Sequence, residues 1–177
     1  MCKNAYKYCS LLLFLIACYS CRPSSPNQVN TGQDELQALE IDHQIDVKGL
    51  ELNDLIYVPI YSDLYADLQN QNLLLSATLS IRNTDLVNPL FINKLDYYDT
   101  HGKLVKDYLN GETISIPPMA TINYVIEKED TSGGSGANFI VSIHAKNKNM
   151  KPIIQAVMVH HSGNKGFAFT TDGYSVL

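Results

Sequence analysis

The chain has 177 residues, 45 % of them hydrophobic and 18 % charged, and its formal net charge is −5. This balance offers no basic stripe that could follow a phosphate backbone, so the sequence argues against nucleic-acid binding. The length suits one domain with an N-terminal extension.

The N-terminal residues 1–17 have the order of a secretory signal peptide. Lys3 and Lys7 precede the apolar run Leu11–Ala17. That run is far shorter than the ~20 apolar residues of a membrane-spanning helix. We therefore expect an export signal, and a core helix of the domain is the alternative interpretation.

The end of this run, Leu15-Ile16-Ala17-Cys18, resembles the lipobox of bacterial lipoproteins. The resemblance implies that Cys18 is acylated with a diacylglyceryl group and a further acyl chain such as palmitate. Several chains on one residue give a stable membrane anchor. It also implies a place in the bacterial cell envelope, at the outer membrane or the periplasmic face. The alternatives are acylation at Cys21 and a signal peptide that is cleaved without lipidation.

The four cysteines all lie within the first 21 residues. The rest of the chain therefore has neither a disulfide nor a thiolate metal site, and its stability must come from packing and backbone pairing.

Residues 18–54 are expected to form a flexible, acidic tether. The stretch begins with Pro, Ser and Asn residues, and residues 34–54 carry seven acidic side chains against Lys48 alone. Alternation from Leu39 to Lys48 also fits a half-buried strand, and a short helix is another interpretation. Whether residues 36–52 pair with the domain stays open. An acidic segment of this kind could also bind cations or a partner.

From residue 55 to 177 the hydrophobic period is two. Short β-rich runs alternate with turn sequences, which is typical of an all-β fold. The expected strands are 56–61, 73–82, 90–98, 113–116, 122–127, 139–144, 153–161 and 167–171. Lys103–Leu109 could form a turn of helix. We predict a single antiparallel β-sandwich, immunoglobulin-like in layout.

Several strings in this region resemble a bacterial family of unknown function, domain of unknown function 3124. They are Tyr57–Ser62, Ser80–Asp85, Asp96–Asp99 with Gly102–Val105, Glu129–Phe139 and Ile154–Met158. The resemblance covers about Leu55 to Phe169 and implies an exported or lipid-anchored envelope protein. It carries no catalytic residues across.

The glycine-rich loop Asp130–Gly136 is the most unusual local feature of the domain. Its backbone N–H groups could face an anion, although no P-loop ending and no helix follow. The other interpretation is a strand connection whose glycines need positive φ angles. We expect any partner-binding surface to include this loop, namely Asp130, Thr131, Ser132, Gly133, Gly134 and Gly136.

No catalytic, cofactor-binding or metal-binding residue is predicted. His160 and His161 are adjacent and point to opposite faces of a strand, so they cannot chelate one ion together. Asp96 and Asp99 lack the ligand spacing of a calcium loop. Ser132 and Ser162 lack the elbow motif of a nucleophilic serine.

The sequence thus predicts a lipid-anchored envelope protein that acts as a non-enzymatic binding or assembly module. Its partner would be an envelope protein, peptide or glycan. A small envelope hydrolase and a cation-responsive module are the two alternatives. An enzyme would need a concave site with converging titratable groups.

Overall fold

The computed structural model describes residues 46–65 and 72–177. The predicted signal segment, Cys18 and the tether up to residue 45 lie outside the described residues. In the described part the chain forms one 3₁₀ turn, Val47–Gly49, and twelve strands. The strands are β1 (Leu52–Pro59), β2 (Asp63–Tyr65), β3 (Asn72–Leu74), β4 (Ser76–Arg82), β5 (Leu90–Tyr98), β6 (Leu104–Asp107), β7 (Ile114–Ile116), β8 (Thr121–Ile126), β9 (Asn138–Ala145), β10 (Ile153–Ser162), β11 (Lys165–Asp172) and β12 (Tyr174–Ser175).

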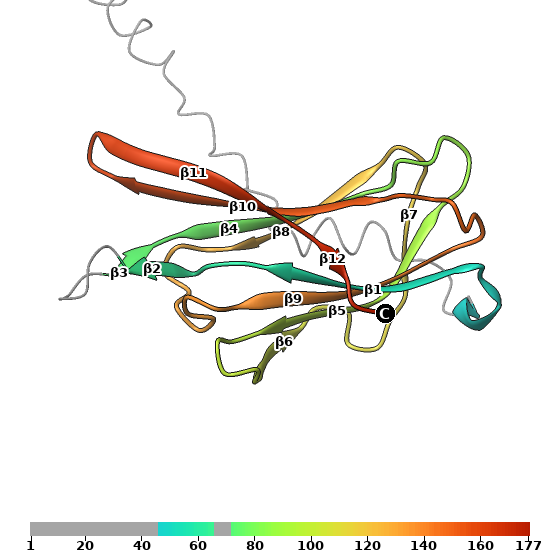
Figure 1. The fold of residues 1–177 in the computed structure, drawn as a ribbon, viewed down its shortest axis with the longest axis horizontal. Coiled ribbons are helices and arrows are strands. Elements are labelled where there is room, and N and C mark those ends of the chain that lie inside the picture. The colour runs from blue at the N-terminus through green and yellow to red at the C-terminus, as the bar shows by residue number, and fades with distance from the viewer. Residues whose placement is uncertain (1–45, 66–71) are drawn as a thin grey trace, which may run out of the picture.

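The strands form two packed sheets and a short ribbon (Figure 1). The large sheet has six strands in the order β12–β1–β9–β5–β6, and β7 also pairs with β5. The small sheet has four strands in the order β11–β10–β4–β8, and β2 pairs with β3. All pairs are antiparallel. The predicted all-β sandwich is confirmed.

The core is built from alternate residues of the facing strands. In β4, for example, Ala77, Leu79 and Ile81 are fully buried, because successive side chains of a strand point to opposite faces. The other main contributions come from β1 (Ile56, Val58), β8 (Ile122, Tyr124, Ile126), β9 (Phe139, Val141, Ile143) and β10 (Ile154, Ala156, Met158). Their shared burial between the two sheets is the main source of stability.

Three local details differ from the sequence prediction. The expected strand 73–82 is interrupted at Leu75, whose N–H donates to Ser62 O at 2.9 Å, and the residues before it pair with β2 instead of β10. The segment 103–109 contains the exposed strand β6 and not a helical turn. Val47–Gly49 is a 3₁₀ turn, and β1 begins at Leu52, before the expected domain start at residue 55.

Strand register gives the sandwich two distinct ends. At one end, the start of β1 meets the loops 83–89, 117–120 and 146–152, and we call this the lysine end. At the other, called the glycine end, the loops 60–62, 99–103 and 127–137 meet. In Figure 1 the β10–β11 hairpin extends past the other strands on the glycine-end side.

Candidate functional site

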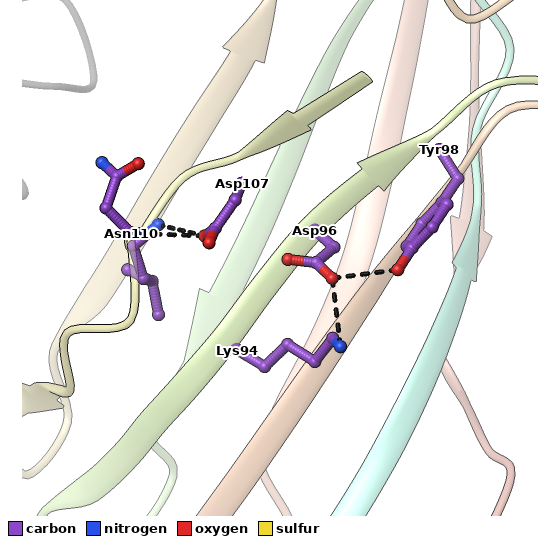
Figure 2. A network of polar contacts seen from close by, with 6 residues as sticks. Lys94, Asp96, Tyr98, Asp107 and Asn110 are labelled. Atoms are coloured by element: carbon purple, nitrogen blue, oxygen red, sulfur yellow. Dashed lines mark hydrogen bonds and ion pairs between the residues drawn. The ribbon is translucent and has the colours of Figure 1, made fainter. Parts of the chain in front are cut away.

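A polar cluster lies on the outer face of the large sheet, on β5 and β6. In β5, Leu95 and Tyr97 point into the core, so Lys94, Asp96 and Tyr98 point outward. The pairing of β5 with β9 shifts register between Ile92 and Lys94. Such a bulge redirects the side chains next to it. Figure 2 shows the outward residues converging on Asp96.

Asp96 is the centre of this cluster and is only 6 % exposed. Its Oδ2 lies 3.1 Å from Lys94 Nζ, and it accepts a hydrogen bond from Tyr98 Oη at 3.0 Å. A buried carboxylate needs such partners, because burying an unpaired charge is costly. The cluster therefore holds one defined negative group at the sheet surface.

A second carboxylate, Asp107 on β6, stands directly opposite Asp96 in the strand register. Like charges at opposed positions destabilise a sheet unless each has other partners. Asp107 Oδ1 accepts the backbone N–H groups of Leu109 and Asn110, both at 2.9 Å (Figure 2). The two carboxylates are thus held separately, one by side chains and the other by a turn.

The two carboxylates border a hollow of about 430 Å³ that crosses four strands. Five of its eight lining residues have polar side chains, and the full lining is Leu55, Asn93, Lys94, Asp96, Leu104, Asp107, Gly111 and Ser142. The hollow offers ammonium and amide donors beside carboxylate and hydroxyl acceptors. This arrangement suits a ligand rich in hydroxyl or amide groups.

Three titratable groups at or beside the hollow have displaced pKa values. The Asp96 carboxylate raises the pKa of Lys94. Burial, followed by the Asp96 hydrogen bond, raises the pKa of Tyr98. Burial lowers the pKa of His144, the residue that lies beside the hollow. General acid–base catalysis instead needs a group whose pKa lies near the working pH.

His144 lies beside the hollow, on the same outer face of β9 as Ser142. Its Nε2 lies 2.9 Å from Asn93 Oδ1 and 3.1 Å from Ser142 Oγ, so it contacts two side chains that line the hollow. Its Nδ1 is buried and has no partner among the described residues. The neutral imidazole thus acts as a rigid polar support.

The predicted loop Asp130–Gly136 lies at the glycine end and is tightly bonded to its neighbours. Gly133 O accepts both the N–H and the Oγ1 hydroxyl of Thr100 at 2.9 Å, and Thr100 Oγ1 accepts from Gly136 N at 2.9 Å. Gly134, at φ +75°, accepts from Ser62 N at 3.0 Å. These hydrogen bonds hold the loop in a defined conformation between β8 and β9.

Two further contacts explain why glycine and aspartate occupy this loop. A Cβ on Gly133 would lie 1.9 Å from Tyr97 Oη, so only glycine fits against that buried ring. The Asp130 carboxylate accepts the N–H and the hydroxyl of Ser132. The N–H groups that could have faced an anion are therefore partly used within the protein. Thr131 remains exposed at the loop surface.

The other residues considered from sequence are dispersed. Asp99 accepts the N–H groups of His101 and Lys103 and closes its own turn, away from the Asp96 cluster. His160 Nδ1 lies 2.8 Å from Leu74 O and its ring stacks on Phe167. Among residues 46–65 and 72–177, no group of three His, Cys, Asp or Glu side chains could hold a metal ion.

Lys94, Asp107 and Ser142 were missed at the sequence level as parts of one site. The sequence feature that could have identified them is a polar side chain at an outward strand position. The same feature is ordinary on any sheet face that contacts solvent. Only the pairing of β6 and β9 with β5 places them around a common hollow.

In the described part of the chain, no helix is long and apolar enough to cross a membrane. The lipid site predicted at Cys18 lies outside that part.

Comparison with known proteins identifies the family. The sequence model of the protein family of unknown function DUF3124 matches residues 53–176, and the chain belongs to this family. No curated protein matches the sequence. A structural match is the crystal structure of Thermotoga maritima 1070, at 15 % identity and a TM-score of 0.38, which covers 68 % of this chain and 92 % of that one.

Proposed function

We propose that this member of the DUF3124 family is a non-enzymatic binding module of the bacterial envelope. It is anchored through acylated Cys18 and binds an envelope glycan on the outer face of the large sheet. The observation that carries the proposal is the polar hollow around the buried carboxylate of Asp96.

The composition of the hollow favours a glycan over an apolar ligand. Lys94 and Asn93 supply donors, while Asp96 and Asp107 supply acceptors, and sugar hydroxyl groups act as both donor and acceptor. Hydrogen bonds to charged groups are the stronger ones, so the carboxylates would dominate affinity. Binding pockets for apolar small molecules are lined mainly by hydrophobic side chains instead.

The protonation states support binding over catalysis. The pKa values of Lys94 and Tyr98, which ordinarily lie well above neutral pH, are raised further, and the lowered pKa of His144 favours its uncharged form. A glycosidase uses paired carboxyl groups as acid and base or nucleophile. In this hollow one oxygen of each carboxylate, Asp96 Oδ2 and Asp107 Oδ1, already accepts an internal hydrogen bond, which leaves the other oxygen to accept from a sugar hydroxyl group.

The test is retention of soluble envelope polysaccharide by the immobilised full chain. Asp96→Asn should weaken retention about tenfold, the loss expected for one charge-assisted hydrogen bond. Glu129→Gln, an exposed acid in the glycine-end loop, is the charge-matched control and should bind normally. Unchanged retention by Asp96→Asn would reject the hollow as the glycan site. Release of new sugar ends during incubation would instead favour the hydrolase.

The anchor has its own test. The support for it is the Leu15-Ile16-Ala17-Cys18 pattern in the sequence. Cys18→Ser should move the processed protein from the membrane fraction to the soluble envelope fraction, with Cys21→Ser as the control. Membrane association that persists in Cys18→Ser would reject acylation at this residue.

A further inference from the structure

The lysine end exposes large apolar side chains. Leu86 and Val87 are 78 % and 77 % exposed at the tip of the β4–β5 loop. Met119 is 63 % exposed in the neighbouring β7–β8 loop, and Ile153 is 47 % exposed at the start of β10. Isolated exposed apolar residues are common, but several gathered on adjoining loops mark an interaction surface.

Hydrogen bonds within and between these loops hold them in place, so the exposed apolar side chains do not lie on unstructured segments. Asp85 Oδ1 accepts the N–H groups of Val87 and Asn88, both at 2.8 Å. Met119 N donates to Asp85 O at 3.2 Å and joins the second loop to the first. The apolar tip is therefore presented in a fixed conformation.

A buried amide secures the base of the tip. Asn83, only 2 % exposed, donates from Nδ2 to Asn88 O at 2.9 Å and to Ile116 O at 3.0 Å. Its Oδ1 accepts from Asp85 N at 2.9 Å. Met119 has a φ of +62°, an uncommon value for a residue with a side chain, and such strain is often found at functional positions.

Cationic side chains lie on the loop next to the apolar tip and at the end of β4. Lys146, Lys148 and Lys151 are exposed on the β9–β10 loop, and Arg82 is exposed at the end of β4. This loop is joined to the tip by Asn147 Nδ2, which donates to Asp85 Oδ2 at 2.8 Å. A second tie runs from Thr84 Oγ1 to Lys151 O at 2.7 Å. The loop that carries the lysines is thus bonded to the loop that carries the apolar tip.

Between the two loops lies a hollow of about 380 Å³, lined by Thr84, Asp85, Leu86, Asn147, Asn149, Met150 and Lys151. The acidic groups at or near this end are Asp85, whose carboxylate accepts hydrogen bonds from its own loop and from Asn147, Asp46 and Glu51 before β1, Asp54 in β1 and Asp172 at the end of β11. Beside the apolar tip the hollow has one lysine and two amides that can donate to a phosphate headgroup, together with the Asp85 carboxylate, which already accepts internal hydrogen bonds.

We propose that the lysine end docks onto a bilayer surface containing anionic lipid. Leu86, Val87 and Met119 would enter the boundary between headgroups and acyl chains, while the lysines contact lipid phosphates. Apolar side chains flanked by cations are typical of proteins that lie at a membrane interface. The chain also enters the sandwich at this end, since β1 begins there. This inference goes beyond glycan binding and does not depend on it.

The sequence permits a direct test because it contains no tryptophan. A Leu86→Trp variant of the full chain gives a single reporter at the tip. It would be mixed with vesicles of brominated phosphatidylcholine, with and without phosphatidylglycerol. We expect a blue shift and bromine quenching that are strong only with phosphatidylglycerol.

His101→Trp, in an exposed turn at the glycine end, is the matched control. Any apolar segment near the N-terminus brings both variants to the vesicle equally, so the difference between them reports orientation. Quenching at position 86 but not 101 supports docking by the lysine end. Quenching that is equal at the two positions, or absent at 86, overturns it and leaves the tip to a protein partner.

The charge contribution is tested separately in the Leu86→Trp background. Replacing Lys146, Lys148 and Lys151 with Gln should reduce quenching to the level seen with phosphatidylcholine alone. Raising the salt concentration should do the same, because exposed charges are screened. Quenching that stays the same after the lysine substitutions and at high salt concentration overturns the anionic-lipid assignment. The glycan assay contains no lipid, so its result is independent of this one.

Discussion

The glycine end and the lysine end of the sandwich are both rigid, but they reach rigidity differently. At the glycine end, backbone groups of Gly133 and Gly136 bond to Thr100, and glycine packs directly on Tyr97. At the lysine end, the side chains of Asn83 and Asp85 bond to backbone groups of neighbouring loops. The glycine-end loop places Gly133 against a buried aromatic ring, whereas the lysine-end loops are bonded at their base and leave Leu86 and Val87 exposed at the tip.

The largest effect is expected for Gly133→Ala. The added Cβ would lie 1.9 Å from Tyr97 Oη and 2.7 Å from Ala137 Cβ, so the buried ring or the loop must move. Overpacking of this kind should lower the free energy of unfolding by about 3 kcal/mol. Urea unfolding of the variant and the parent measures this change in the free energy of unfolding. The control is Gly49→Ala, where nothing lies within 4 Å of the new Cβ. Equal stability of the two variants would contradict the tight packing at the glycine end.

Asn83→Ala tests the corresponding support at the lysine end. It removes donors to Asn88 O, Ile116 O and Pro117 O and leaves buried carbonyl groups without them. We expect a loss of about 2 kcal/mol in urea unfolding. Asn149→Ala, an exposed amide on the neighbouring loop, should have little effect. A small loss for Asn83→Ala would mean that the tip is held by other contacts.

The Asp85 carboxylate should make this support depend on pH. Its pKa is lowered by hydrogen bonds, first from the Asn88 backbone and then from the Asn147 side chain. A group with a lowered folded pKa contributes its full stability above the ordinary value of about 3.9, and loses it as the pH falls below that value. Asp85→Asn should therefore be less stable than the parent at pH 7, and this difference should shrink below about pH 4.

Urea midpoints measured across the acid range provide the comparison, with Glu129→Gln as a control that keeps the parent's profile. A stability difference for Asp85→Asn that stays constant with pH would show that the charge of this carboxylate plays no part.

The smallest effect is expected for the double variant Leu86→Ser and Val87→Ser. Both side chains are exposed, so the free energy of unfolding should change by no more than about 0.5 kcal/mol. Calorimetry or urea unfolding measures this. A loss comparable to that of Asn83→Ala would mean that the two residues belong to the packed structure and are not displayed at its surface.

Much of the fold follows from local sequence. Strand β5 begins and ends where the two-residue period predicts, and β4, β8, β9 and β10 lie within their predicted segments apart from a residue or so at the ends. The turn residues around Gly102 and Asn110–Gly111 adopt the positive φ angles that such residues favour. These features depend on neighbours in the chain, so the pattern of residue types is sufficient to predict them.

The break at Leu75 and the exposed strand β6 could not be predicted in the same way. Leu73 and Leu74 continue the alternation of β4. They nevertheless pair with β2, whereas β4 pairs with β10. Strand β6 is exposed throughout and lacks an alternating pattern. Pairing partners are chosen over long sequence separations, where local periodicity carries little information.

For this protein the sequence by itself determined the β-sandwich class, the family and the unusual composition of the Asp130–Gly136 loop. Only the tertiary structure decided that Lys94, Asp96 and Asp107 share a hollow, and that Leu86, Met119 and the lysines of the β9–β10 loop share an end. The physical reason is that strand register brings together residues from separate strands and loops. The type of a residue indicates the chemistry of its side chain, but not which other side chains will lie next to it.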